Sequence, residues 1–184
     1  MEISDIIKPE NLTEEEIIKD DKFKAGCIYG KPRRGHPEGE VIYHIKEVLN
    51  NVDKYSDQSN RSDLRLTALI HDSFKYKVDQ SKPRSGVNHH GFIARKFAEK
   101  FIQTSRVLET IELHDEAYNS WQIGEKRLDW KKAEKRAIIL IDRIKNDLDF
   151  YLIFYRCDNE TGDKNYDNYL WFRDLVEKQK LKTL

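Results

Sequence analysis

The stretch LTALIHDSFK, residues 66–75, decides the interpretation of this sequence, because an apolar run of helical character ends on an adjacent histidine and aspartate. His71 offers an imidazole nitrogen and Asp72 a carboxylate oxygen, and both atoms are ligands of divalent metal ions. Neighbouring residues diverge by about 100° on an ideal helix, so the pair can bind one ion only at a helix end. Taken alone, the pair is more typical of a buried histidine beside a capping aspartate.

The composition indicates one soluble domain. A chain of 184 residues is long enough for a single domain with a full hydrophobic core. Lys+Arg and Asp+Glu both number 33, so the net charge gives no general argument for nucleic acid or acidic membranes as partners. The cysteines, Cys27 and Cys157, predict neither a disulfide framework nor a zinc cluster. With no run of signal or membrane-span length, we expect a cytoplasmic protein without membrane contact.

Apolar residues recur at spacings of three and four, which predicts helices and no convincing strand pair. Helices are expected at about 13–19, 38–53, 62–72, 89–102, from Thr104 onward, 130–157 and 166–179. Segments 20–35 and 76–87 are expected to be loops, Trp121 and Gly124 to mark a turn, and Asn146-Asp147 to allow a break. We therefore predict an all-α, single-domain bundle of roughly six to eight helices over residues 1–184. Its motif-bearing core is about 36–158, followed by a C-terminal helix within 159–184.

The histidines are concentrated in one part of the chain, since all six fall between positions 36 and 114. A single histidine on the apolar face of a helix is usually a satisfied core residue. Several of them, with acidic residues beside them in a helical bundle, suggest a metal site in the bundle core. A mixed nitrogen and oxygen donor set suits Mn²⁺, Fe²⁺, Co²⁺, Ni²⁺ or Zn²⁺, whereas Mg²⁺ usually prefers oxygen alone.

The order of these residues resembles the HD superfamily of metal-dependent phosphohydrolases. That family has a histidine, then a His-Asp pair, then a distant aspartate, all in an α-helical bundle. His44, in EVIYH, matches the first histidine, His71-Asp72 matches the pair, and Lys75 matches a lysine that often follows it. The lead-in HPEG at 36–39 is similar to that of HD domains attached to CCA-adding tRNA nucleotidyltransferases. The resemblance covers roughly residues 36–158.

Two aspartates are open as the last ligand of the motif. Asp142, in LIDR, has the helical setting of some family members. Asp158, in YRCD, follows a long helix and precedes a polar turn, as in the tRNA nucleotidyltransferase type, and is the favoured alternative. The other of the two is then a surface or helix-capping carboxylate.

The resemblance also implies roles for the remaining histidines. Some subfamilies add two histidines between the pair and the last aspartate, for a second metal or for phosphate, and His90 and His114 match that order. His89 is an alternative to His90, because only one of them can point inward from a first helical turn. His36 is expected to be structural or to lie in the substrate cleft.

The resemblance implies a metal-dependent phosphatase or phosphodiesterase with one or two divalent ions (Mn, Fe, Co, Ni, Zn or Mg). His44, His71, Asp72 and Asp158 are expected to hold one of them. Asp72 and Lys75 are the candidate catalytic residues. Arg33 and Arg34 are candidates for binding phosphate, although a solvated basic turn is the commoner role of such a cluster. No glycine-rich phosphate loop is present, so ATP-driven transfer is not supported.

The expected substrate is a small phosphorylated molecule, a nucleotide or an RNA end such as a 2′,3′-cyclic phosphate or 2′-nucleotide. The contrasting hypothesis is a non-catalytic ligand-sensing or nucleic-acid-binding helical module with a structural metal. An enzyme requires open positions at the metal and a cleft lined with Lys and Arg, whereas a structural site is buried and closed by four protein ligands. A homodimer is compatible with this pattern, but no sequence feature requires it.

Overall fold

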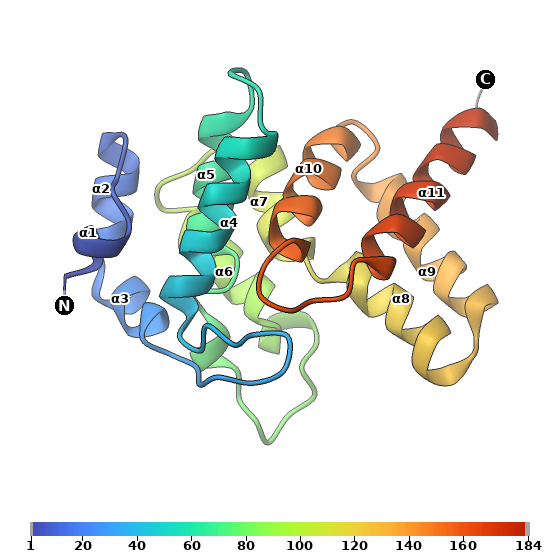
Figure 1. The fold of residues 1–184 in the computed structure, drawn as a ribbon, viewed down its shortest axis with the longest axis horizontal. Helices are drawn as coiled ribbons and strands as arrows, with labels where there is room; N and C mark the ends of the chain where they lie inside the picture. Colours follow the sequence, from blue (N-terminus) through green and yellow to red (C-terminus); the bar gives the residue numbers. More distant parts are fainter. Residues whose placement is uncertain (1, 183–184) are drawn as a thin grey trace.

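The computed structural model describes residues 2–182, and the regular structure in this range is helical apart from an isolated bridge between Arg33 and His36. The middle of the molecule is built by α4 (Val41–Tyr55), α5 (Arg61–Ile70), α6 (His90–Ala98), α7 (Ser105–Leu113) and α10 (Leu148–Asn159). The N-terminal helices α1 (Ile3–Ile6), α2 (Leu12–Lys19) and α3 (Asp21–Cys27) lie at one end (Figure 1). The opposite end is formed by α8 (Glu116–Arg127), α9 (Trp130–Arg143) and α11 (Asp167–Lys182). The prediction of an all-α bundle is confirmed.

Helix α10 joins two hydrophobic clusters, one on each of its faces. The larger cluster contains apolar residues of α1–α7, and α10 contributes Phe150, Phe154 and Cys157 to it. The smaller cluster lies among α8, α9 and α11, and it receives Leu148, Tyr151 and Tyr155. Within each set, the three residues are spaced three and four positions apart and so lie on one side of the helix. The two sets project from different sides. Asp158, near the end of α10, is therefore held between two packed layers.

Segment 20–35, expected to be a loop, contains helix α3, and the expectation is wrong there. Asp20 begins the helix by accepting hydrogen bonds from the backbone N–H groups of Lys22 and Phe23. Gly26 does not break the helix. A Cβ at Gly26 would lie 1.7 Å from the backbone oxygen of Ser73, so glycine allows α3 to press against the turn that carries His71 and Asp72.

The turn expected at Trp121 and Gly124 is also wrong, because both residues lie inside α8. The ring of Trp130 covers Gly124, where a Cβ would lie 2.2 Å from the nearest ring atom. The chain turns instead at Leu128, which adopts the left-handed conformation with φ of 57°. The break allowed by Asn146-Asp147 is present, since α9 ends at Arg143 and α10 begins at Leu148. Residues 2–182 thus contain eleven α-helices, more than the six to eight expected.

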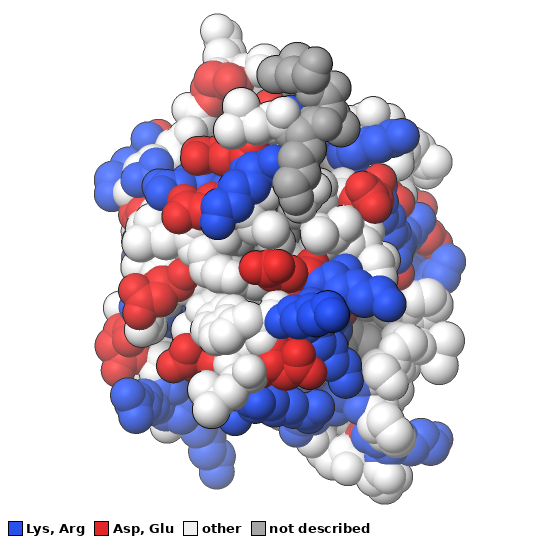
Figure 2. All heavy atoms as spheres, turned by 90° about the vertical axis from the view of Figure 1, so that its right-hand side faces the viewer, with Lys and Arg blue, Asp and Glu red and all other residues white. Residues whose placement is uncertain are grey.

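Two further short elements, 3₁₀ turns at Lys75–Lys77 and Gly86–Asn88, flank a connecting segment between α5 and α6. On the face presented by the C-terminal helices, Lys and Arg are interspersed with Asp and Glu (Figure 2). Among the described residues, no helix combines the length and apolar character needed to cross a membrane.

Candidate metal centre

The ends of three helices bring the predicted motif residues together. His44 lies in the first turn of α4, His71 is the residue at the C-terminal end of α5, and Asp158 lies in the last turn of α10. Asp72 follows in the turn after α5, so the pair escapes the divergence that a mid-helix position would impose. His44, His71 and Asp72 are buried, with at most 3 % of each residue exposed.

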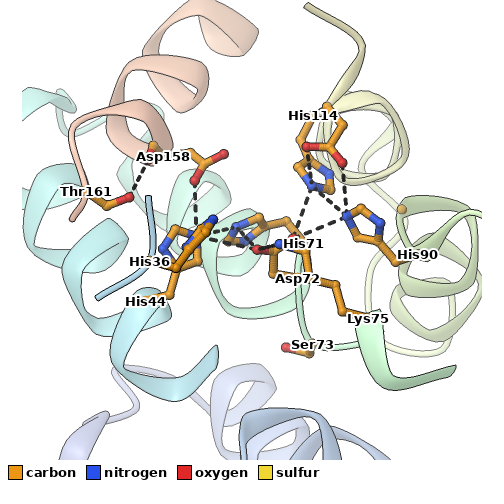
Figure 3. A network of polar contacts seen from close by, with 12 residues as sticks. His36, His44, His71, Asp72, Ser73, Lys75, His90, His114, Asp158 and Thr161 are labelled. Atoms are coloured by element: carbon orange, nitrogen blue, oxygen red, sulfur yellow. Dashed lines mark hydrogen bonds and ion pairs between the residues drawn. The ribbon is translucent and has the colours of Figure 1, made fainter. Parts of the chain in front are cut away.

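We name His44, His71 and Asp158 the first half of the cluster. Nε2 of His44 lies 3.1 Å from Oδ1 of Asp158 and 3.3 Å from Nε2 of His71. Oδ2 of Asp72 lies 3.5 Å from Nε2 of His44 and 3.7 Å from Nε2 of His71. These atoms converge on one point from three different helices (Figure 3).

His90 and His114 lie on the other side of Asp72 (Figure 3), and together with Asp115 they form the second half of the cluster. Nε2 of His90 and Nε2 of His114 lie 3.1 Å apart, and each lies 3.3 Å from Oδ1 of Asp72. Asp115 approaches His90 to 3.4 Å through Oδ2 and His114 to 3.5 Å through Oδ1. Asp72 therefore faces one half with each of its carboxylate oxygens.

Close packing of α6 on α7 brings His90 to His114. A Cβ at Gly91 would lie 2.5 Å from the backbone oxygen of Glu112, so glycine permits this approach. Of the neighbouring histidines, His90 points into the cluster. His89 caps the N-terminus of α6, and its Nδ1 accepts a hydrogen bond from the backbone N–H of Gly91. Its Nε2 lies 3.7 Å from Oδ2 of Asp115, and His89, His90 and Asp115 each offer a ligand atom within 4.8 Å of the others.

The protonation of two rings shows that the cluster suits a cation. Nδ1 of His71 lies 2.9 Å from the backbone oxygen of Ala68, and Nδ1 of His114 lies 2.9 Å from that of Ile111. A carbonyl oxygen only accepts, so each Nδ1 carries the hydrogen and Nε2 of the neutral ring presents a lone pair. These lone pairs and the carboxylate oxygens face the same points, where a cation or protons must separate them. The buried Oδ1 of Asp72 also has no described partner in hydrogen-bond geometry.

The charges of the cluster follow from burial and from neighbouring groups. Burial lowers the pKa of His71 to about 3, so this ring is neutral at pH 7. Burial opposes ionisation of Asp72, but Lys75 and the surrounding imidazoles outweigh it and hold its pKa well below the usual range. His114 is buried as well, yet Asp115 and Asp72 raise its pKa to about 9. Without a metal ion, His114 thus carries a proton that metal ligation would displace.

Two lysines neutralise the carboxylates. Lys75 forms an ion pair with Oδ2 of Asp72. Nζ of Lys164 lies 2.8 Å from Oδ1 of Asp158 and also donates to the backbone oxygen of Asp158, at 2.9 Å. Both lysines reach the cluster from its open side, where their side chains are 26 % and 19 % exposed.

His36 lies beside His44 and is connected to it through Glu38. Nδ1 of His36 lies 2.8 Å from Oε1 of Glu38, and the same oxygen lies 3.5 Å from Nδ1 of His44. Burial opposes ionisation of Glu38, but the two imidazoles outweigh it and lower its pKa to about 2. The resulting carboxylate faces Nδ1 of His44 from the side away from the cluster, a position from which a charge can orient the ring, although this nitrogen has no hydrogen-bond partner among the described residues.

Two hollows meet above the cluster, and both are lined by Arg33, His36, Asp72, Lys75, Asp115 and Tyr118. The smaller hollow, of about 590 Å³, continues along Tyr29, Gln80, Arg84, His89 and Asn119. The larger hollow, of about 700 Å³, continues along Arg34, Trp121, Gln122, Tyr155, Lys164 and Asn168. Arg33 and Arg34 are exposed at the rim, and the cluster itself forms the floor. Asp142 is exposed on α9 and lines neither hollow.

Three residues at this site were not predicted: Asp115, Glu38 and Lys164. Asp115 had a recognisable signal, because His114-Asp115 repeats the His-Asp pair at the end of another helix. Glu38 belongs to the HPEG lead-in, which was considered only for its similarity to other HD domains. Lys164 lies in a polar turn whose position against Asp158 only the packing of α10 and α11 determines.

Comparison with known proteins gives one match. The family model described as HD domain matches residues 41–149, more than half of the chain, and it ends before Asp158. Neither the curated proteins nor the solved structures contain a match. HD domains are in general metal-dependent hydrolases of phosphorylated substrates, and the buried His and Asp groups found here could hold such a metal. The chain belongs to the HD domain family.

Proposed function

We propose that the protein is a metal-dependent phosphohydrolase that acts on a phosphomonoester or phosphodiester of a nucleotide or RNA end. The observation that carries the proposal is the arrangement of two sets of imidazole nitrogens on either side of one bridging carboxylate, Asp72, at the floor of an open cleft. His44, His71, Asp72 and Asp158 would hold one divalent ion, and His90, His114 and Asp115 with Asp72 a second. An ion in these positions supplies Lewis acidity toward a phosphoryl oxygen and toward a water nucleophile.

The side chains around the floor are suited to a phosphate group. Burial opposes the charged form of Lys75, but Asp72, Asp115 and Asp158 outweigh it and raise its pKa, so Lys75 is a cation at neutral pH. It lines both hollows and can neutralise a non-bridging phosphoryl oxygen. Arg33 lines the same junction and can bind a second oxygen of the phosphate.

The openness of the cluster supports an enzyme over a structural metal site. A structural site is closed by four protein ligands, whereas this cluster lies beneath two hollows lined by Arg33, Lys75, Arg84 and Lys164. The side chain of Asp115, which belongs to the second half, is 31 % exposed. A substrate can therefore approach the atoms that would hold the ions.

Turnover of a generic ester tests this proposal. Protein stripped with a chelator and then supplied with Mn²⁺ should hydrolyse p-nitrophenyl phosphate or bis(p-nitrophenyl) phosphate, and stripped protein should not. The His71→Ala/Asp72→Ala double variant should show no metal-dependent turnover, while Asp142→Ala, with its exposed side chain, should behave as the unmodified protein. Absence of metal-dependent turnover with both esters and with nucleotides would refute the proposal.

A further inference from the structure

The larger hollow differs from the smaller one in its aromatic wall and in a buried hydroxyl. We propose that the larger hollow binds the base of a nucleotide whose phosphate lies on the floor shared by the two hollows. The inference rests on the proposed function, since it assigns the two ends of the substrate to two parts of the same cleft. The base is a planar heterocycle, and the hollow offers it a stacking surface and fixed polar groups.

Helix α8 connects the cluster to the aromatic wall. Asp115 immediately precedes this helix and faces the second half, and Tyr118 and Trp121 follow on the next turns. Six residues of helix rise about 9 Å at 1.5 Å per residue, a length comparable with the separation of phosphate and base in a nucleotide. One rigid helix therefore sets the distance between the phosphate position and Trp121.

Two aromatic rings stack on each other beside the larger hollow. The centroids of Tyr118 and Trp121 lie 6.0 Å apart with 25° between the ring planes, and both residues line this hollow. Aromatic rings bind every base through its π-face, whereas hydrogen-bonding groups distinguish among bases. The smaller hollow shares Tyr118 with the larger one but is not lined by Trp121, and its own lining adds Tyr29 and the polar groups of Gln80 and Arg84.

The polar groups of the larger hollow point to a ligand independently of the rings. Tyr155 lines the hollow, and its buried hydroxyl has no hydrogen-bond partner among the described residues. A buried hydroxyl without a partner is costly, and a ligand atom in the hollow would satisfy it. Asn168 is 5 % exposed, and its side-chain oxygen accepts a hydrogen bond from the backbone N–H of Tyr169 at 2.7 Å. Its amide is thereby held in place at the wall.

Binding of two matched phosphonates to the protein as purified tests the inference. The first probe is the phosphonate analogue of AMP, which lacks the scissile ester oxygen, and the second is methylphosphonate, which lacks the nucleoside. Calorimetry measures the affinity for each probe. Trp121→Ala should lower the affinity for the AMP analogue by about tenfold or more, the usual effect of losing base stacking, and leave the affinity for methylphosphonate unchanged. Trp121→Phe should retain most of the affinity, and Tyr155→Phe should lose several-fold through its hydroxyl alone.

Tyr29→Ala is the matched control, because Tyr29 lines only the smaller hollow. It should bind both probes as the unmodified protein does. If Trp121→Ala weakens binding of both probes equally, Trp121 has a structural role and the inference is overturned. The inference is also overturned if only Tyr29→Ala weakens binding of the AMP analogue, or if neither variant does. Binding is measured without turnover, so the two proposals can fail separately. If the protein shows the predicted binding pattern but hydrolyses no phosphoester, the proposed function is refuted and the base site is still supported.

Discussion

The two halves of the cluster share Asp72 but differ in burial and in support. In the first half, His44 and His71 are 3 % and 0 % exposed, and helices α4, α5 and α10 enclose them. In the second half, His90 begins α6, and the side chain of Asp115 is 31 % exposed toward the hollows. The histidines of both halves are buried, but the side chain of Asp115 is 31 % exposed and that of Asp158 only 15 %. The difference teaches that one carboxylate can join a more enclosed position to a more open one. We expect the first half to retain its ion and the second half to meet the substrate.

The largest effect is expected from a ligand of the first half. His71→Ala should lower kcat for bis(p-nitrophenyl) phosphate by about a thousandfold or more, because Lewis acidity contributes several kcal/mol to such reactions. His90→Ala should lower kcat by only about tenfold to a hundredfold, because the first half is intact in that variant. Steady-state kinetics at saturating Mn²⁺ measure both. An equal loss in the two variants would show that the halves do not differ in this way.

Asp158 should be nearly as important as the histidines of the first half, through its contact with His44. Asp158→Asn removes the negative charge 3.1 Å from Nε2 of His44 and should lower kcat by about a hundredfold. Asp142→Asn, its matched control on the exposed face of α9, should leave kcat unchanged. Loss of turnover in Asp142→Asn with normal turnover in Asp158→Asn would reverse the assignment of the last ligand.

The metal-free protein should become less stable at alkaline pH through His114 of the second half. Burial opposes protonation of His114, but Asp115 and Asp72 raise its pKa from 6.5 to about 9. Because the folded state holds the proton more tightly, the stabilisation is complete below about pH 6.5 and is lost as the pH rises through 9, on the order of 3 kcal/mol.

Urea unfolding of metal-free protein at pH 6 and pH 9.5 measures this loss. The free energy of unfolding of His114→Gln should decline less over the same interval, since the variant has no imidazole to deprotonate. An identical decline in both proteins would assign the pH dependence to other groups.

The smallest effect is expected from Glu38, which supports the first half from behind. Glu38→Gln keeps the size of the side chain and removes the charge that faces Nδ1 of His44 at 3.5 Å. The affinity of the protein for Mn²⁺ should fall about tenfold, as is usual when a carboxylate behind a metal-binding histidine is changed. Glu40→Gln is the control, because the side chain of Glu40 makes no capping hydrogen bond at the start of α4. Equal affinities in the two variants would remove the positioning role of Glu38.

The helical class was predictable because the apolar spacing is regular. The glycines, however, led to wrong predictions of where individual helices end. Gly26 and Gly124 look like helix breakers in a sequence, whereas the structure uses both for close contact, with Ser73 and with Trp130. The contact of Gly26 joins segments distant in the chain, and that of Gly124 depends on how α9 folds back on α8, so no local pattern reveals them. The break between α9 and α10 was predictable because Asn146 and Asp147 favour a helix end locally.

The candidate site was partly predictable for a similar reason. The His71-Asp72 pair and the order of histidines are local features, and the structure places His44, His90 and His114 around that pair. The position of Asp158 against His44 depends on how α10 packs between two hydrophobic clusters, which a linear pattern does not contain. Asp115 was missed although it follows His114 directly, because its inward position depends on the start of α8.

The metal content of the purified protein tests the central claim most directly. Elemental mass spectrometry after reconstitution with Mn²⁺ should find about one or two equivalents in the unmodified protein and in Asp142→Ala. Asp72→Ala should lose metal from both halves, because its two oxygens face both sets of imidazoles. Unchanged metal content in Asp72→Ala, or no bound metal in the unmodified protein, would contradict the account.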